Sequence, residues 1–421
     1  MTHSDPSSPP TGSLADLRVL DLSRILAGPT ATQLLGDLGA EIIKVERPGK
    51  GDDTRGWGPP FLKDSSGKDT HESAYYLSSN RNKKSIAIDI SKEEGRALIR
   101  QLADQSDILV ENFKVGDLKR YGLDYATLSK RNARLIYCSI SGFGQSGPYA
   151  GHAGYDFLIQ GMGGIMSITG EGGPESAGPL KVGVGIADIM CGMYATVAVL
   201  AAVEARHRTG KGQHIDISLL DSQIAWLANQ GVSYLVSGKT PQPLGNAHPT
   251  IVPYETFPGS DHAFILAVGN DAQFARFCAT AACPDLCEDL RFSKNADRVR
   301  NRGVLIPLLQ DITRTRSAAD WISALEAVGV PCGPINTIPE VFDDPQVQHR
   351  GMQINLPHTA GAEGSVSLIG NPIKLSDTPV HYRSAPPQLG EHTRDILKNT
   401  LSLSEEAIRN LTDTGTVEAM D

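Results

Sequence analysis

The sequence predicts an α/β protein: a large Rossmann-like domain built on a parallel sheet, with a smaller α+β domain. From Leu17 onward, short apolar runs alternate with amphipathic helical patterns. Repeated strand–helix–strand units with apolar strands are typical of a parallel sheet that is covered on both faces. The length of 421 residues and the hydrophobic content of 40% suit two cores rather than one.

The elements are expected in the following order. The first strand–helix–strand unit comprises RVLDLS (18–23), TATQLLGDL (30–38) and EIIKVE (41–46). Gly28 and Pro29 mark the loop into its helix, and Gly39 closes the helix. The pattern continues with a strand at 84–90, a helix at 92–105, strands at 107–113 and 134–144, a long helix at 189–207 and a strand at 214–220.

Beyond Asp221 the pattern changes to mixed short elements, including helices near 274–282 and 317–330. The chain then returns to strands and loops (364–370 and 371–376) and a final helix at 391–401. We therefore expect a second domain inserted between two parts of the first. The expected divisions are a disordered tail (1–13), the large domain (14–222), the small domain (223–335) and a return segment that completes the large domain (336–421).

Composition excludes several classes of protein. With 39 basic and 48 acidic residues the net charge is −9, which argues against nucleic acid or an anionic membrane as the main partner. Six cysteines do not form a disulfide framework, which indicates a reducing compartment. No apolar run reaches the roughly 18 residues of a membrane span, and the polar start of the chain resembles no leader. A cytoplasmic location is expected; a mitochondrial one stays open for a eukaryotic source, although no transit peptide is evident.

The common nucleotide, hydrolase and metal motifs are missing. The turn after the first strand reads SRILAGP rather than G-x-G-x-x-G, so Glu46 at the end of the next strand is weak evidence for a nicotinamide dinucleotide site. Arg47 beside it suits a phosphate, or is a solvated surface residue. Cys278, Cys283 and Cys287 lack zinc-ligand spacing, so no metal is expected.

One carboxylate stands out. Asp188 follows a run of small and apolar residues and begins a long apolar helix. At such a junction it is either a helix cap or a carboxylate displayed for nucleophilic or base chemistry. Upstream, Tyr155 and Asp156 occupy a glycine-flanked turn, either as site residues or as ordinary turn residues.

Taken together, these segments resemble the class III CoA-transferase family (CaiB/BaiF type). The resemblance runs from LRVLDLSRILAGPTATQLLGDLGAEIIKVERPGKGDDTRGWGPPF through NRNKKSIAIDI, VENFKVGDLKRYGLDY, YCSISGFGQSGPYAGHAGYD and ADIMCGMYATVAVLAAVEARHRTGKGQHIDISLLDSQ to GVPCGPIN and LGEHT. The stretches GDDTRGWGPPF, LGNAHPTIVPYETF and GNDAQF are most similar to the branch that uses succinate with glutarate or hydroxymethylglutarate.

The resemblance implies an enzyme that moves CoA from an acyl-CoA such as succinyl-CoA to a free carboxylic acid. Asp188 matches the nucleophile, which would pass through an aspartyl anhydride and an aspartyl-CoA thioester. A carboxylate with a reference pKa near 3.9 is expected to be ionised without a base. The residues that match CoA contacts are Arg47, Ile88, Asn112, Phe113 and Arg120, and those near the acyl site are Trp57, Tyr75, Tyr155 and Asp156.

The resemblance also implies an interlaced homodimer with CoA thioesters as substrates and no permanently bound cofactor. A dicarboxylate needs a cation for its distal carboxylate; Arg55 and Arg81 are the candidates, and each is equally suited to a structural role. His152 replaces the basic residue usual before the GYD turn, and the glycine-rich lid of the formyl branch is missing after Asp221.

Three alternatives stay open. An α-methylacyl-CoA racemase of the same fold would need a histidine where Tyr155 stands, and tyrosine is a poor base at neutral pH. A non-catalytic CoA-binding protein would retain the same contacts. A nicotinamide-dependent oxidoreductase is disfavoured by the missing glycines. The acceptor acid is undetermined among glutarate, hydroxymethylglutarate, malate, itaconate and mesaconate.

Overall fold

The structure, a computed structural model, describes residues 12–173 and 176–420. Most of the predicted N-terminal tail therefore lies outside the described residues. Two compact units divide the chain: the larger comprises Met1–Gly164, Val182–Val232 and Gln346–Asp421, and the smaller comprises Ile165–Lys181 and Ser233–Pro345. The segment at 165–181, which we expected in the large domain, belongs to the smaller unit, and that unit ends at 345 rather than 335.

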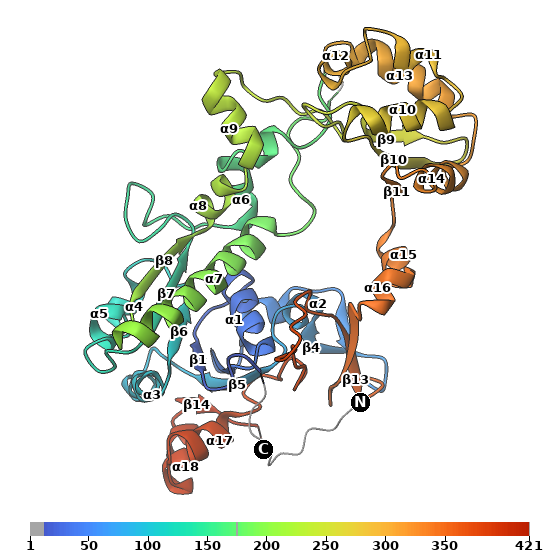
Figure 1. Cartoon of the computed structure of the whole chain (residues 1–421). Coiled ribbons are helices and arrows are strands. Elements are labelled where there is room, and N and C mark those ends of the chain that lie inside the picture. The colour runs from blue at the N-terminus through green and yellow to red at the C-terminus, as the bar shows by residue number, and fades with distance from the viewer. Residues whose placement is uncertain (1–11, 174–175, 421) are drawn as a thin grey trace. The chain divides into compact units, whose positions relative to one another are not determined.

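The larger unit is built on a seven-stranded sheet (Figure 1). Its strands are β1 (Arg18–Asp21), β2 (Glu41–Glu46), β5 (Lys83–Ile88), β6 (Ile108–Glu111), β7 (Ile136–Ser141), β8 (His214–Ser218) and β14 (Val417–Glu418). They lie in the order β14-β5-β2-β1-β6-β7-β8, and every pair is parallel except β14 with β5. The six parallel strands therefore follow the Rossmann order, and this confirms the predicted fold class.

Alternating side chains give the sheet a core on each face. One core holds Val19 and Ile42 with residues of α1 (Ala27–Asp37) and α7 (Ile186–Thr209). The other holds Leu20 and Ile43 with α3 (Glu93–Asp104) and the C-terminal helices. Consecutive residues of one strand thus enter opposite cores, as the period of two in a strand requires. The predicted burial of the sheet on both faces is confirmed.

The remaining elements of the larger unit are short. They are η1 (Asp53–Gly56), β3 (Phe61–Lys63), β4 (Asp69–Ser73), α2 (Ala74–Leu77), α4 (Asp117–Arg120), α5 (Tyr125–Leu128), α6 (Asp156–Met162), α8 (Leu219–Ala225), β12 (Gln353–Pro357), β13 (Ser365–Ile369), α17 (Thr393–Asp395), η3 (Ile396–Thr400) and α18 (Glu405–Asp413). The helix expected at 391–401 is a single turn followed by the π-helical turn η3, which buries the adjacent Ile396 and Leu397. The stretch expected as a strand at 371–376 forms none.

The smaller unit has its own core. A three-stranded antiparallel sheet in the order β11-β10-β9 packs with helices around Phe257, Phe264, Phe274 and Trp321, so the unit is α+β as predicted. Its elements are η2 (Ile165–Ser167), β9 (Tyr254–Pro258), β10 (Ala263–Ala267), α10 (Asp271–Thr280), α11 (Asp285–Glu288), α12 (Asn295–Arg300), α13 (Arg302–Thr313), α14 (Ala318–Glu326), β11 (Cys332–Pro334) and α15 (Ile338–Asp343). Helices α9 (Ala228–Ser237) and α16 (Pro345–His349) contain the boundaries between the units.

Helix α7 corrects one expectation from the sequence. Its 24 residues are long and apolar enough, by length and composition, to cross a membrane, although no such run was expected. The expectation from the sequence counted only uninterrupted apolar runs, and Asp188 interrupts this one. The average hydropathy over the helix stays high in spite of that one acidic residue. Half of the most apolar window is buried, and Cys191, Ala195 and Val199 lie in the core beside the sheet, as in a core helix.

Candidate active site

The candidate site lies at the carboxyl ends of the parallel strands. The strand order reverses between β1 and β6, because successive strands are added on one side of β1 up to β5 and on the other from β6 onward. In open α/β sheets this switch point is where a ligand crevice forms. Two pockets are found here, and Arg24, after β1, and Phe113, after β6, line both of them. The two pockets therefore adjoin each other and together make up the crevice at the switch point.

The first pocket is a cavity of about 350 Å³ whose lining combines four basic residues (Arg24, Lys44, Arg47 and Arg120) with four acidic ones (Glu46, Asp52, Asp89 and Asp117). Four of the five residues predicted to contact CoA line it: Arg47, Ile88, Phe113 and Arg120. Arg47 is exposed and makes no ion pair among the described residues, whereas Arg120 is loosely paired with Asp117 at 3.4 Å. Guanidinium groups with free donors beside an apolar wall suit the phosphates and adenine of a nucleotide.

The second pocket, of about 170 Å³, contains Asp188. Tyr155, which is 63% exposed, and Asn112 line the same pocket, so the structure brings these three predicted residues together. Arg24, Lys114 and His152 are the basic or titratable nitrogen groups in its lining. A carboxylate thus lines a small pocket that adjoins the larger one.

Asp156 positions Asp188 rather than facing the pocket. Asp188 lies in the first turn of α7, whose N-cap residue, Gly185, has no side chain. The Asp156 carboxylate, at the start of α6, accepts hydrogen bonds from the backbone N–H of Ala187 at 2.8 Å and of Asp188 at 3.3 Å. Its other oxygen accepts from Gln160 Nε2 at 2.7 Å. This residue therefore caps α7 from outside the helix and fixes the turn that carries Asp188.

The environment of Asp188 disfavours its charged form. Burial, and secondly the negative charge of Asp156, raise the pKa of Asp188 to about 7. At neutral pH the neutral form of Asp188 is therefore populated beside the carboxylate, which the sequence did not predict because it does not reveal the desolvation. A carboxylate with a raised pKa is a better nucleophile once ionised.

Trp57 and Tyr75 lie together beside this pocket without lining it. Their rings form an edge-to-face pair with centroids 5.1 Å apart. Burial, followed by the negative charges of Asp188 and Asp156, raises the pKa of Tyr75 to about 12. The phenol therefore stays neutral, and it lies close enough to both carboxylates to interact with them electrostatically.

Arg55 and Arg81, the candidates for the distal carboxylate, are placed elsewhere. Arg55 is 5% exposed; its guanidinium donates to both oxygens of Glu46 at 2.7 Å and of Glu72 at 2.8 Å. Arg81 is 4% exposed and forms a bidentate pair with Asp37 at 2.9 and 2.6 Å. Neither lines the pocket of Asp188. Both arginines therefore have structural roles, and the Glu46 carboxylate pairs with Arg55 rather than binding a ribose.

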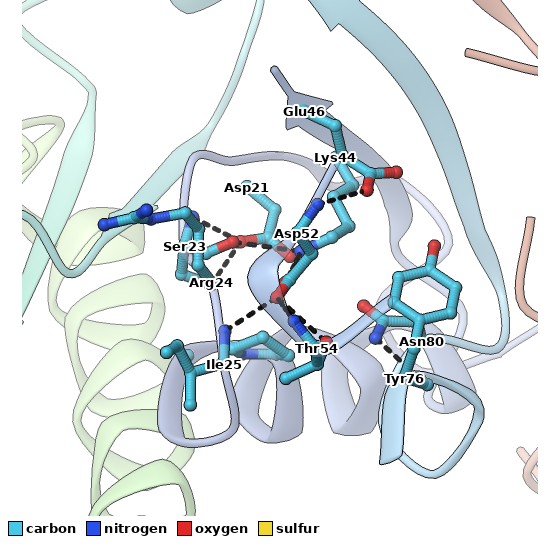
Figure 2. Close-up of polar contacts among 12 residues, drawn as sticks. Asp21, Ser23, Arg24, Ile25, Lys44, Glu46, Asp52, Thr54, Tyr76 and Asn80 are labelled. Carbon is cyan, nitrogen blue, oxygen red and sulfur yellow. Dashed lines mark hydrogen bonds and ion pairs between the residues drawn. The ribbon is translucent and has the colours of Figure 1, made fainter. Parts of the chain in front are cut away.

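The residues that sequence reasoning missed form a buried polar cluster (Figure 2), and two of its members, Lys44 and Asp52, belong to the lining of the first pocket. Lys44 and Asp52 are fully buried and form an ion pair at 2.8 Å. Asp21, at the end of β1, pairs with Lys83 at 3.2 Å and is likewise buried. The available signal was a charged residue within an apolar strand, such as Lys44 in EIIKVE and Asp21 in RVLD. Within the described residues no group of three or more potential ligands could hold a metal.

A family model described as CoA-transferase family III matches residues 14–393, which is most of the chain. The chain belongs to this family. CoA-transferases act on CoA thioesters.

Proteins of known activity and structure are similar over nearly the full length. A succinate–glutarate CoA-transferase of Agrobacterium fabrum is 46% identical, covering 97% of this chain and 100% of that protein. A human succinyl-CoA:glutarate CoA-transferase is 42% identical, covering 96% of this chain and 90% of that protein. The crystal structure of a CaiB/BaiF family protein from Brucella suis is 48% identical, with a TM-score of 0.80, and covers 92% of this chain and 98% of that one.

Proposed function

We propose that this enzyme transfers CoA from succinyl-CoA to glutarate or a closely related dicarboxylate, with Asp188 as the nucleophile. The observation that carries the proposal is the position of Asp188 in a small pocket that adjoins the arginine-lined cavity and shares Arg24 and Phe113 with it. The substrates named for the similar proteins from Agrobacterium fabrum and from human are the same pair.

The transfer takes place in four acyl exchanges. An Asp188 oxygen attacks the thioester carbonyl, the C–S bond breaks, and CoA thiolate leaves behind a mixed anhydride. The thiolate attacks the aspartyl carbonyl, which releases succinate and forms an aspartyl-CoA thioester. The acceptor carboxylate attacks this thioester and again releases the thiolate, which then attacks the acceptor carbonyl of the new anhydride. Asp188 is regenerated as a carboxylate, and no external base or energy source is needed.

The division of the crevice suits this sequence of steps. The CoA phosphates would lie among Arg47, Arg120 and Arg24, and the thioester would reach Asp188 in the inner pocket. Arg24, Lys114 and His152 are the groups available there to pair with the second carboxylate of a dicarboxylate. A racemase would need a histidine in place of Tyr155, and a non-catalytic CoA-binding protein would have no use for a carboxylate of raised pKa in the inner pocket.

Intact-protein mass spectrometry tests the nucleophile. After incubation with succinyl-CoA and trapping with borohydride or hydroxylamine, we expect a modification of the wild type that maps to Asp188 and is missing from Asp188→Asn. Asp188→Asn should retain CoA binding, because none of the basic residues of the outer pocket is changed. Normal turnover by Asp188→Asn would refute the covalent mechanism. Separately, turnover of the wild type with a panel of mono- and dicarboxylates identifies the acceptor.

We also propose that the enzyme acts as a homodimer. Large apolar side chains on α6 and α7 are exposed in the single chain, among them Phe157 (59%), Met193 (47%) and Val197 (63%). These two helices pack on each other within the larger unit, and we infer that their exposed apolar residues share one face. Monomeric soluble proteins rarely leave such faces open, and a second copy of the chain is the occupant we propose.

A further inference from the structure

The segment Ser23–Ile25 joins β1 to α1 at the switch point and has no regular secondary structure. Asn112, which follows β6 on the other side of the switch point, clamps its middle residue. The backbone N–H of Arg24 donates to Asn112 Oδ1 at 2.9 Å, and Asn112 Nδ2 donates to the Arg24 carbonyl at 2.7 Å. Both the oxygen and the nitrogen of the Asn112 side-chain amide are thus bonded to the backbone of Arg24. Asn112 therefore acts on the crevice through Arg24.

The buried pair of Lys44 and Asp52 holds the two flanking residues (Figure 2). Lys44 Nζ donates to the Ser23 carbonyl at 2.9 Å. Asp52 Oδ1 accepts from the backbone N–H of Ile25 at 3.2 Å and from Thr54 at 3.0 Å. Both residues belong to the lining of the first pocket, but neither side chain has any exposed surface.

Ile25 is held in a backbone conformation that its side chain opposes. Its φ is +74°, in the left-handed region that β-branched residues avoid. Such strain persists where the surroundings over-determine the conformation, and it gathers at functional sites. Here the hydrogen bonds made by the backbone of Arg24 and Ile25 hold the conformation in place. Without them, the segment would relax towards negative φ.

The strained segment forms a wall of the pocket that contains Asp188. Arg24 and Ile25, with the following Leu26 and Ala27, line this pocket. The same stretch is tied to the helix of Asp188, because Gly192 of α7 lies so close to Ala27 that a Cβ there would come within 2.5 Å of the Ala27 carbonyl oxygen. Relaxation of Ile25 would therefore shift the pocket wall relative to the carboxylate.

We infer that Asn112 and Asp52 are positioning residues, which hold the Ser23–Ile25 segment in its strained shape so that the inner pocket presents the thioester to Asp188. The inference rests on the proposed transfer at Asp188 and deepens it. Small misplacements in such a site are costly in rate, whereas a flexible wall still admits the ligand. The clamp should accordingly affect turnover more than the binding of CoA.

Asn112→Ala tests this, with Asn132→Ala as a matched control. Asn132 also clamps backbone, accepting from Arg134 N–H at 3.1 Å and donating to the Ser106 carbonyl at 2.9 Å, but it lines neither pocket of the crevice. We expect Asn112→Ala to lower kcat for succinyl-CoA with glutarate at least tenfold while Kd for CoA changes less than threefold. Asn132→Ala should leave both within twofold. A Kd that rises as much as kcat falls, or an unchanged kcat, would overturn the inference.

Rescue by Ile25→Gly separates positioning from general damage. Glycine adopts positive φ without strain, so the segment no longer has a bias towards negative φ when the clamp is removed. In the Ile25→Gly background, Asn112→Ala should therefore lower kcat less than threefold. An undiminished loss of kcat would refute the role of strain.

Asp52→Asn tests the second residue of the clamp, because its amide oxygen can still accept from the Ile25 N–H. It should lose less turnover than Asp52→Ala when both variants are compared at equal folded fraction. Equal losses would show that Asp52 is not part of the clamp.

The wild type shows which proposal fails. If the wild type forms no adduct at Asp188 and transfers no CoA, the proposed function is wrong. If the wild type transfers CoA and Asn112→Ala behaves as Asn132→Ala does, the clamp alone is wrong.

Discussion

At the scale of single residues, the protonation of Asp188 sets the expected pH dependence of transfer. Burial and Asp156 raise its pKa to about 7, so the neutral form persists up to that pH. Only the carboxylate is a nucleophile. We therefore expect kcat/KM to rise with pH and to level off above about 7, with roughly one tenth of the plateau value at one pH unit below the pKa.

Asp156→Asn provides the matched variant for that profile. Its amide oxygen can still accept from Ala187 and Asp188 N–H, while the charge that helps raise the pKa is removed. The midpoint of the profile should move to lower pH. A rate independent of pH between 5 and 8 in the wild type would contradict the assignment of Asp188.

Arg55 illustrates how a residue's partners decide its role. Arg55→Met would leave the buried carboxylates of Glu46 and Glu72 without their cation, and breaking a buried ion pair from one side costs about 3–5 kcal/mol. We expect the free energy of unfolding in urea to fall by about that amount. Arg131→Met, which breaks the exposed pair with Asp104, should cost about 1 kcal/mol or less. Unchanged stability together with a higher KM for dicarboxylates alone would restore the original hypothesis.

At the scale of elements, the close packing of α7 on α1 depends on Gly192. A Cβ at this position would come within 2.5 Å of the Ala27 carbonyl oxygen and 3.0 Å of Thr30 Cβ. Gly192→Ala should push the helices apart, lowering stability by about 1–3 kcal/mol despite alanine's better helix propensity, and it should slow transfer. The melting temperature and kcat measure this.

Gly303→Ala is the control, because it makes the same change in α13 where a Cβ would meet nothing within 4 Å. Helix propensity acts alone there, and we expect no loss of stability. Equal effects at the two glycines would mean that α1 and α7 tolerate a wider separation.

At the scale of the whole molecule, the exposed apolar face of α6 and α7 predicts assembly. Light scattering after size-exclusion chromatography should give twice the chain mass of 45.0 kDa. Val197→Asp should shift the mass towards the monomer, because it buries a charge in the interface. Val304→Asp, at a position 47% exposed on α13, should not. A wild-type monomer that binds lipid vesicles through α7 would refute the dimer.

Local pattern accounts for much of the fold. The alternation of Val19 with Leu20 and of Ile42 with Ile43 is visible in the sequence, and it recurs as the two cores of the sheet. Local pattern does not reveal ion-pair partners. Arg81 finds Asp37 from 44 residues away, and Arg55 donates to a carbonyl 332 residues further on. Such distances along the chain explain why two structural arginines resembled ligands for a carboxylate.

The sequence by itself determined the strand–helix order and the family, and it singled out Asp188 as the predicted nucleophile, because local periodicity and motifs carry this information. Tertiary structure alone decided that Asp188 is desolvated beside Asp156, that Asn112 grips Arg24, and that Asp52 holds a strained Ile25. These properties arise where the ends of β1 and β6 meet, and they depend on burial and on contacts between residues as much as 88 positions apart. Neither the burial of a residue nor its distant contacts can be read from the pattern of a single segment.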